Sequence, residues 1–171
     1  MLLNMFLSLL KNLMNWNSLL ISGFLVWLAQ LTIANILIID TVRPDFIGIF
    51  IMYWSVSFGR FIGTICGMIF GLIFDLSGSA LYFGLSPLIY STTGYLSGNL
   101  KGLYSKMNPL LFNFIWVTIL LIQFFIFCIV NYQEILIVNP NLFFGKWIGT
   151  SMYTISFMLI MQFIYPLNRI E

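Results

Sequence analysis

Long runs without a charged residue are the feature of this chain that most restricts its fold. No Asp, Glu, Lys or Arg occurs between Lys106 and Glu134. A transmembrane helix requires about 20 mostly apolar residues, because the hydrocarbon core of a bilayer is about 30 Å thick. Charged residues make up only 7% of the chain, whereas a water-soluble domain carries about 25% to keep its surface hydrated. We therefore predict an all-α integral membrane protein.

One charged residue in an otherwise apolar stretch indicates a break between two helices. Arg60 lies midway between Asp45 and Asp75, and a single helix through it would bury the guanidinium in the membrane at a cost of about 2.5–3.5 kcal/mol. A tight turn at Gly59 and Arg60 avoids this cost, so we predict two short helices here. With the longer apolar runs on either side, residues 18–167 form a bundle of six transmembrane helices. Their predicted bounds are 18–39, 45–58, 61–75, 79–96, 109–130 and 147–167.

Basic residues are distributed unevenly among the predicted loops. If the N-terminus lies in the cytoplasm, five basic residues fall on the cytoplasmic side and two, Arg43 and Lys146, on the outer side. This bias is the one that the positive-inside rule expects. The sequence therefore predicts a multi-pass protein with both termini in the cytoplasm. The five inner basic residues are Lys11, Arg60, Lys101, Lys106 and Arg169.

Residues 1–17 precede the first predicted span and have an amphipathic pattern. Their polar residues recur at helical spacing, with Leu, Phe and Trp elsewhere around the helix. This pattern predicts an interfacial helix lying on the cytoplasmic face of the bilayer. Docking to a cytoplasmic partner is the alternative interpretation.

The tripeptide Arg43-Pro44-Asp45 has the composition of a helix start. Proline suits the first helical turn, where its missing N–H costs nothing, and an acidic residue is stabilised by the positive end of the helix dipole.

Asp75 ends the helix predicted for 61–75 and lies only about 22 Å along the axis from Arg60, at about 1.5 Å per residue. Its carboxylate therefore falls short of the far membrane surface. A charge in that position needs a partner or a wet cavity. We expect Arg43 to be that partner.

Glycine recurs every four residues along the helix predicted for 61–75 and just before it. Glycines stacked in this way let a second helix approach closely. That helix belongs either to this protein or to a partner, and the sequence leaves both interpretations open. The next helix, 79–96, is rich in small and polar residues, which predicts a place inside the bundle. The four glycines are Gly59, Gly63, Gly67 and Gly71.

No group of residues capable of catalysis is apparent in this sequence. The chain has no His, and Cys66 and Cys128 lie far apart in apolar runs, where we expect them to act as small packing residues. A metal site needs several ligands, and a phosphate-binding loop needs a glycine spacing that is absent here. No basic cluster is available for a nucleic acid. We predict a protein that is not an enzyme, without cofactor, metal or nucleic-acid partner.

Amide side chains occur within the predicted helices and have two possible roles. They could line a binding pocket, or they could form hydrogen bonds between helices, and we favour the second role. The residues are Gln30, Asn35, Asn113, Gln123 and Gln162.

An ordered set of short motifs runs through residues 43–98, about a third of the chain. The motifs are Arg43-Pro44-Asp45, Tyr53-Trp54, the segment 67–76, Ser77-Gly78-Ser79, Phe83-Gly84 and the segment 94–98. In this order they resemble the bacterial rod shape-determining protein MreD family. The residues we single out as structural or partner-facing are Arg43, Pro44, Asp45, Tyr53, Trp54, Gly63, Gly67, Gly71, Asp75, Gly78 and Gly84.

The resemblance implies a protein of the bacterial cytoplasmic (inner) membrane that acts in the cell-wall elongation complex and maintains rod cell shape. It implies association with an MreC-like protein of one membrane span. Through that protein it implies a link to MreB, to the glycan polymerase RodA and to RodA's partner transpeptidase. It also implies no activity of its own and a fold similar to the six-helix substrate-binding subunits of energy-coupling-factor transporters.

That shared fold leaves a second interpretation open, in which the chain is the substrate-binding subunit of a vitamin transporter. Such a subunit needs an outward-facing pocket lined by polar and aromatic groups. Tyr82, Tyr90 and Tyr95, in the fourth predicted helix, could line one. Proteins that co-purify with the chain would distinguish the two interpretations.

Overall fold

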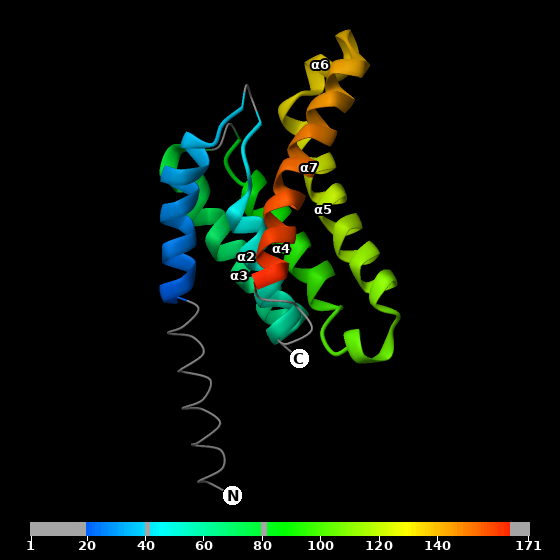
Figure 1. Ribbon diagram of the computed structural model, residues 1–171. Helices are drawn as coiled ribbons and strands as arrows, with labels where there is room; N and C mark the ends of the chain where they lie inside the picture. The colour runs from blue at the N-terminus through cyan, green and yellow to red at the C-terminus, as the bar shows by residue number, and fades with distance from the viewer. Residues whose placement is uncertain (1–19, 40–41, 80–81, 165–171) are drawn as a thin grey trace, which may run out of the picture.

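The computed structural model describes residues 20–39, 42–79 and 82–164, and in these residues the regular structure is helical, without a strand (Figure 1). The first described helix covers Leu20–Ile36. The amphipathic helix predicted for residues 1–17 lies outside the described residues. The other elements are α2 (Phe46–Phe58), α3 (Arg60–Phe74), a π-helical turn (Asp75–Ser79), α4 (Leu85–Gly98), a 3₁₀ turn (Tyr104–Lys106), α5 (Pro109–Asn131), α6 (Gln133–Val138) and α7 (Pro140–Ile164).

Three of the described helical segments are long and apolar enough to cross a bilayer: Arg60–Gly78, Pro109–Asn131 and Pro140–Ile164. The helices Leu20–Ile36 and Phe46–Phe58 are apolar but shorter. Large hydrophobic side chains cover the outside of the bundle, as expected of a surface in contact with lipid rather than water. The all-helical, membrane-type architecture predicted from the sequence is therefore confirmed.

The predicted break between the second and third helices is found at Gly59. α2 ends at Phe58 and α3 begins at Arg60, and Figure 1 shows the two helices running in opposite directions. Gly59 has φ +94°, which L side chains rarely adopt, so the turn depends on glycine. Its N–H donates to the carbonyl of Ser55 at 2.7 Å. Arg60 is exposed at this end of the bundle, so the hairpin prediction is confirmed.

The fourth helix starts later than predicted, at Leu85 instead of residue 79. Two glycines with positive φ interrupt the chain before it, Gly78 at +75° and Gly84 at +94°. Gly78 lies in the π-helical turn that follows α3, and Gly84 is the N-cap of α4. Because neither conformation continues an α-helix, α4 begins only after Gly84.

The C-terminal helices also differ from the prediction. α7 begins at Pro140 rather than at residue 147, because proline is well suited to the first turn of a helix. The short helix α6, which the sequence analysis did not predict, connects α5 to α7. Glu134 lies in the first turn of α6, where the helix dipole stabilises a negative charge.

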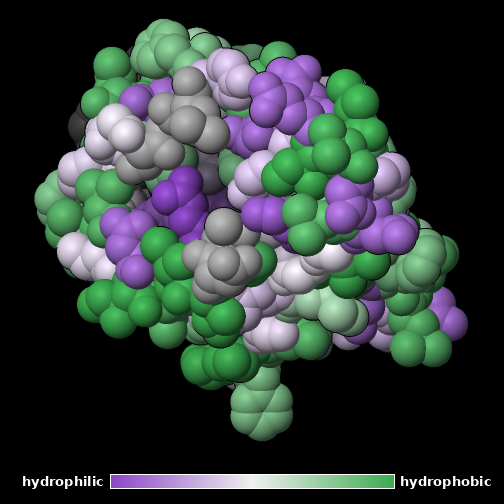
Figure 2. Space-filling model, turned by 90° about the horizontal axis from the view of Figure 1, so that it is seen from above, coloured by the Kyte–Doolittle hydropathy of each residue, from purple (hydrophilic) through white to green (hydrophobic). Residues whose placement is uncertain are grey.

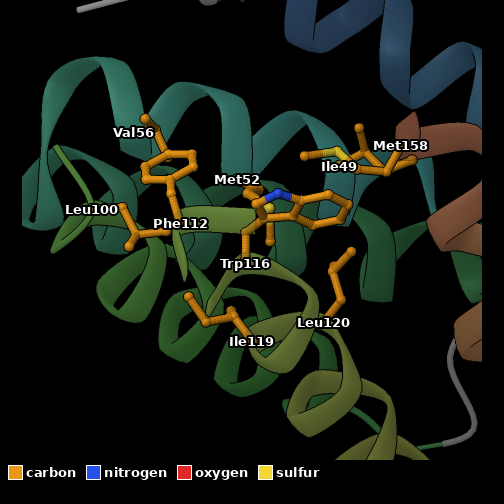
Figure 3. Close-up of a cluster of buried hydrophobic side chains, with 9 residues drawn as sticks. All are labelled: Ile49, Met52, Val56, Leu100, Phe112, Trp116, Ile119, Leu120 and Met158. Atoms are coloured by element: carbon orange, nitrogen blue, oxygen red, sulfur yellow. The ribbon is translucent and has the colours of Figure 1, made fainter. Parts of the chain in front are cut away.

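The larger of two apolar clusters joins α5 to α2 and α7. Figure 3 shows Trp116 and Phe112 of α5 beside Met52 and Val56 of α2. Met158 of α7 belongs to the same cluster. The second cluster contains Ile47, Ile51, Cys66, Phe70, Phe74, Ile89 and Tyr90.

Cys66 and Cys128 are buried and free, as expected for small packing residues. Cys66 lies in the second apolar cluster. Cys66 lies on α3 and Cys128 on α5.

α3 and α4 pack with their backbones in contact because glycines face the neighbouring helix. A Cβ at Gly63 would overlap the carbonyl of Gly94, and a Cβ at Gly67 would overlap the carbonyl of Tyr90. Gly71 meets the backbone of α4 in the same way. The interpretation of packing within the protein is therefore confirmed. The alternative, in which a partner's helix docks on these glycines, is wrong, because α4 already fills that groove.

Candidate functional site

The candidate site is built around Asp45, at the end of the bundle where α2 begins. Asp45 is the N-cap of α2, and its Oδ1 accepts from the N–H of Gly48 at 2.8 Å. The same carboxylate accepts from the hydroxyl of Tyr90 on α4 at 2.9 Å and from Nε2 of Gln123 on α5 at 2.6 Å. Asp45 is only 9% exposed, and these donors satisfy the carboxylate where water is scarce.

Two further side chains extend this network to the first and last helices. Gln30 donates to the carbonyl of Pro44 at 3.1 Å and accepts from the N–H of Phe46 at 2.7 Å. Thr154 of α7 accepts from the N–H of Asp45 at 3.2 Å. The start of α2 is thus bonded to the first helix, α4, α5 and α7.

Thr93 of α4 orients the amide of Gln123. Its hydroxyl lies 3.1 Å from Oε1 of Gln123 and 2.9 Å from the carbonyl of Ile89. Because a hydroxyl has one hydrogen, it donates to one of these acceptors at a time. A bond to Oε1 leaves the Nε2 of Gln123 directed at Asp45.

The predicted hydrogen-bonding role of the helix amides is confirmed for most of them. Gln30 and Gln123 join helices around Asp45. Gln162 of α7 donates to Oδ1 of Asn113 on α5 at 3.1 Å. Asn35 instead donates to a carbonyl of its own helix, so it does not join two helices.

A cavity of about 380 Å³ lies beside the network, and we refer to it as the Asp45 cavity. Its polar lining includes Arg43, Asp45, Tyr90 and Asn131, and much of the remaining wall is aromatic or aliphatic. Figure 2 views this end of the molecule and shows hydrophilic residues around a hollow, with hydrophobic residues towards the outside.

The expected ion pair between Arg43 and Asp75 is not formed. The guanidinium of Arg43 lies over the ring of Phe74, 5.4 Å from its centroid, in a cation–π arrangement. Oδ2 of Asp75 accepts from the N–H of Gly84 at 2.6 Å, and Oδ1 has no hydrogen-bond partner among the described residues. The prediction failed because the backbone N–H of Gly84, just before α4, bonds to the carboxylate instead of Arg43.

The predicted residues Tyr53 and Trp54 lie on α2, away from the Asp45 cavity. Tyr53 packs against the larger apolar cluster. Trp54 stacks between Phe50 and Phe58, with ring centroids at 5.6 and 4.7 Å. Both side chains therefore make packing contacts within the bundle.

Of the three tyrosines considered for a pocket, Tyr90 alone lines the Asp45 cavity. Tyr82 and Tyr95 are about half exposed on the surface. No local pattern around Tyr90 or Thr154 connects either residue with Asp45. The one usable signal for Tyr90 was the small, polar composition of its helix, which placed that helix inside the bundle.

The polar side chains around Asp45 bond mainly to one another and to the backbone at the start of α2. Within residues 20–39, 42–79 and 82–164, no group of three or more His, Cys, Asp or Glu is placed to hold a metal ion. Each oxygen of Asp45 is engaged in bonds to other helices. These features define a class: a helical membrane protein with a buried polar network, centred on Asp45, that joins its helices.

The comparison with protein families identifies the particular family. The family described as rod shape-determining protein MreD matches residues 10–167 of the 171-residue chain. The chain therefore belongs to the MreD family, which supports a role in determining rod cell shape. Comparison with curated proteins and with solved structures gave no match.

Proposed function

We propose that this protein is a non-enzymatic scaffold of the cell-wall elongation complex in the bacterial cytoplasmic membrane. In this role it binds an MreC-like protein of one membrane span, and through it connects to MreB, RodA and RodA's partner transpeptidase. Family membership across residues 10–167 carries the proposal. The use of buried polar groups for internal bonds supports it, because a scaffold needs a stable bundle with apolar faces left for partners.

The scaffold has six membrane spans with both termini in the cytoplasm. Arg60 begins α3, and the side chain of Lys101 lies beside the turn at Gly59, so basic residues gather at one end of the bundle. Asp45 and Glu134 lie towards the other end. The positive-inside rule places the Lys101 end in the cytoplasm. In Figure 1 the first described helix begins, and α7 ends, on the side opposite to α6, which supports an even number of spans.

The groove between α5 and α7 at the Lys101 end is the contact for the partner's transmembrane helix. Figure 1 shows these helices diverging from α6, and the groove between them has a volume of about 540 Å³. Phe163 is 92% exposed at its edge, and Phe114 is 69% exposed. Gln162 and Asn113 also line the groove and bond to each other there. A single apolar helix packed against these side chains would replace lipid with close van der Waals contact.

Two experiments test the proposal. The tagged chain is first purified from its own membranes in mild detergent, and an MreC-like protein with RodA or its transpeptidase is expected among the co-purifying proteins. A benzophenone amino acid at Phe163 should then cross-link to the MreC-like protein, whereas one at Phe61, an exposed phenylalanine on α3, should not. Absence of these proteins from the purified complex would exclude the scaffold role, and equal cross-linking from both positions would exclude the groove.

The Asp45 cavity favours one second candidate, the substrate-binding subunit of an energy-coupling-factor vitamin transporter. Such a subunit has a pocket at its outer end, and Tyr90 lines a cavity of about 380 Å³ at the corresponding end here. The same purification distinguishes the two functions, because a transporter subunit would co-purify with a pair of cytoplasmic ATPases and their coupling subunit.

A further inference from the structure

The Asp45 cavity has the size of a ligand site. Its volume of about 380 Å³ lies within the range of about 300–1,000 Å³ in which proteins bind small molecules. Its walls are largely apolar, so the body of a fitting molecule is apolar as well. The apolar wall comes from four parts of the chain and includes Ile38, Phe74, Leu85, Ile89, Phe124 and Phe127.

Most polar groups that line this cavity are already engaged in internal hydrogen bonds. Asp45 accepts from donors on α2, α4 and α5. Gln30 and Gln123 use both ends of their amides in bonds to other elements. The hydroxyl of Thr150 donates to a carbonyl of α7. The bonds of Asp45, Gln30 and Gln123 hold helices together, and the Thr150 bond lies within α7, so we do not expect these groups to select a ligand.

Arg43 is the charged group of the cavity wall whose donors have no hydrogen-bond partner among the described residues. Its guanidinium lies over Phe74, which is also part of the wall. Within the described residues it makes no hydrogen bond or ion pair. A guanidinium presents a planar fork of N–H donors that matches a carboxylate or phosphate. Ser86, in the first turn of α4, lines the same cavity, and its hydroxyl likewise makes no hydrogen bond to the described residues.

We infer that the Asp45 cavity binds an anionic amphiphile, a molecule with an apolar chain and a single carboxylate or phosphate. The ligand's apolar chain lies along the wall formed by Phe74, Ile89 and Phe124. Its anionic group bonds to the guanidinium of Arg43, and the hydroxyl of Ser86 is the second donor. The carboxylate of Asp45 does not oppose an anion strongly, because three donors already stabilise its charge. A cationic ligand would leave the donors of Arg43 without a partner.

Such a molecule has two possible sources with the same chemistry: the headgroup end of an anionic membrane lipid, or a soluble amphipathic acid. The site does not depend on the proposed scaffold function. It lies at the opposite end of the bundle from the α5–α7 groove, so loss of ligand binding and loss of partner binding are separately measurable.

Ligand binding is tested by native mass spectrometry on the full chain, delipidated in mild detergent. Phosphatidylglycerol represents the lipid, decanoate represents the soluble acid, and phosphatidylcholine with the same acyl chains is the zwitterionic control. Saturable binding of phosphatidylglycerol, of decanoate or of both is expected, and phosphatidylcholine should bind about tenfold more weakly because it carries no net negative charge. Binding of phosphatidylglycerol alone identifies the membrane as the source, and binding of decanoate alone identifies a soluble acid.

Four variants locate the site. Arg43→Gln should weaken binding about tenfold or more, because a charge-assisted bond is lost, whereas Arg43→Lys retains the charge and should weaken it less. Ser86→Phe fills the cavity with Arg43 in place and should abolish binding. Arg60→Gln removes an arginine charge from the opposite end and should leave binding unchanged.

Three results would overturn the inference. They are the absence of saturable binding to monodisperse wild-type protein, equal binding of phosphatidylcholine, and wild-type affinity in both Arg43→Gln and Ser86→Phe. Size-exclusion elution and thermal melting establish that each variant is folded. If Arg43→Gln does not fold, Ser86→Phe and Arg43→Lys decide the outcome.

Discussion

Replacement of Asp45 tests whether the buried network holds the bundle together. In Asp45→Ala the hydroxyl of Tyr90 and the amide of Gln123 lose their acceptor at a buried site, and α2 loses its N-cap. An unsatisfied buried donor costs about 1–3 kcal/mol and a lost cap about 1 kcal/mol. Rearrangement recovers part of this sum, so we expect the free energy of unfolding to fall by about 3–5 kcal/mol.

Asp45→Asn is expected to cost much less, because Gln123 can turn its amide. The new amide nitrogen would face Nε2 of Gln123, which lies 2.6 Å from Oδ2 in the wild-type protein. If Gln123 rotates by half a turn, its oxygen accepts from the new amide and its nitrogen donates to Thr93. The hydroxyl of Thr93 then donates to the carbonyl of Ile89, 2.9 Å away. Every group keeps a partner, and the expected loss is about 1 kcal/mol.

Gln123→Glu should be severely destabilising, because it sets two carboxylates face to face. The double variant with Asp45→Asn restores a donor opposite an acceptor and should recover most of that loss. Unfolding in mixed detergent and dodecyl sulfate, followed by tryptophan fluorescence, gives the free energies for a double-mutant cycle. Asn99→Ala is the control, because the amide of Asn99 bonds only within its own exposed helix end. A change below about 0.5 kcal/mol in Asp45→Ala, or no recovery in the double variant, would refute the reasoning.

Three further predictions use the same unfolding measurement. Gly67→Ala should lower the free energy of unfolding by about 2 kcal/mol or more, because the new Cβ overlaps the backbone at Tyr90. Gly145→Ala, where a Cβ would have nothing within 4 Å, should be neutral or slightly stabilising. Equal effects of the two substitutions would contradict the close packing of α3 and α4. Gln30→Leu should cost about 1–3 kcal/mol and raise hydrogen exchange at the start of α2, since two bonds to that turn are lost; unchanged exchange would contradict this. Trp116→Ala should cost about 3–5 kcal/mol by opening a cavity in the larger apolar cluster, and a loss below about 1 kcal/mol would contradict its place there.

The class of the protein and the hairpin at Gly59 were predictable from the sequence because both depend on local energetics. A long run of apolar residues is stable in the hydrocarbon core of a membrane, whereas burying the charged guanidinium of Arg60 there is costly. The glycine pattern of α3 was less informative. It indicates that a helix packs closely there, but the sequence pattern is the same whether that helix is α4 or a partner's helix.

The Asp45 network could not be predicted, because its members are distant in sequence. Asp45 contacts Tyr90, Gln123 and Thr154 only once the helices are packed. The local sequence around each of the three residues does not indicate that they share this contact. The failed Arg43–Asp75 pair has a similar cause. Two opposite charges near one membrane surface suggested a pair, but the backbone of the connection before α4 supplied a nearer donor to Asp75.

The order in which this chain is synthesised gives the Asp45 network a further consequence. The partners of Asp45 follow it by 45, 78 and 109 positions, on α4, α5 and α7. A ribosome therefore delivers α2 to the insertion machinery long before its partners exist, and a lone carboxylate is costly in lipid. We therefore expect the start of α2 to stay at the boundary between lipid and water until α5 is inserted. On this reasoning, insertion is complete only when the later helices enclose Asp45 within the bundle.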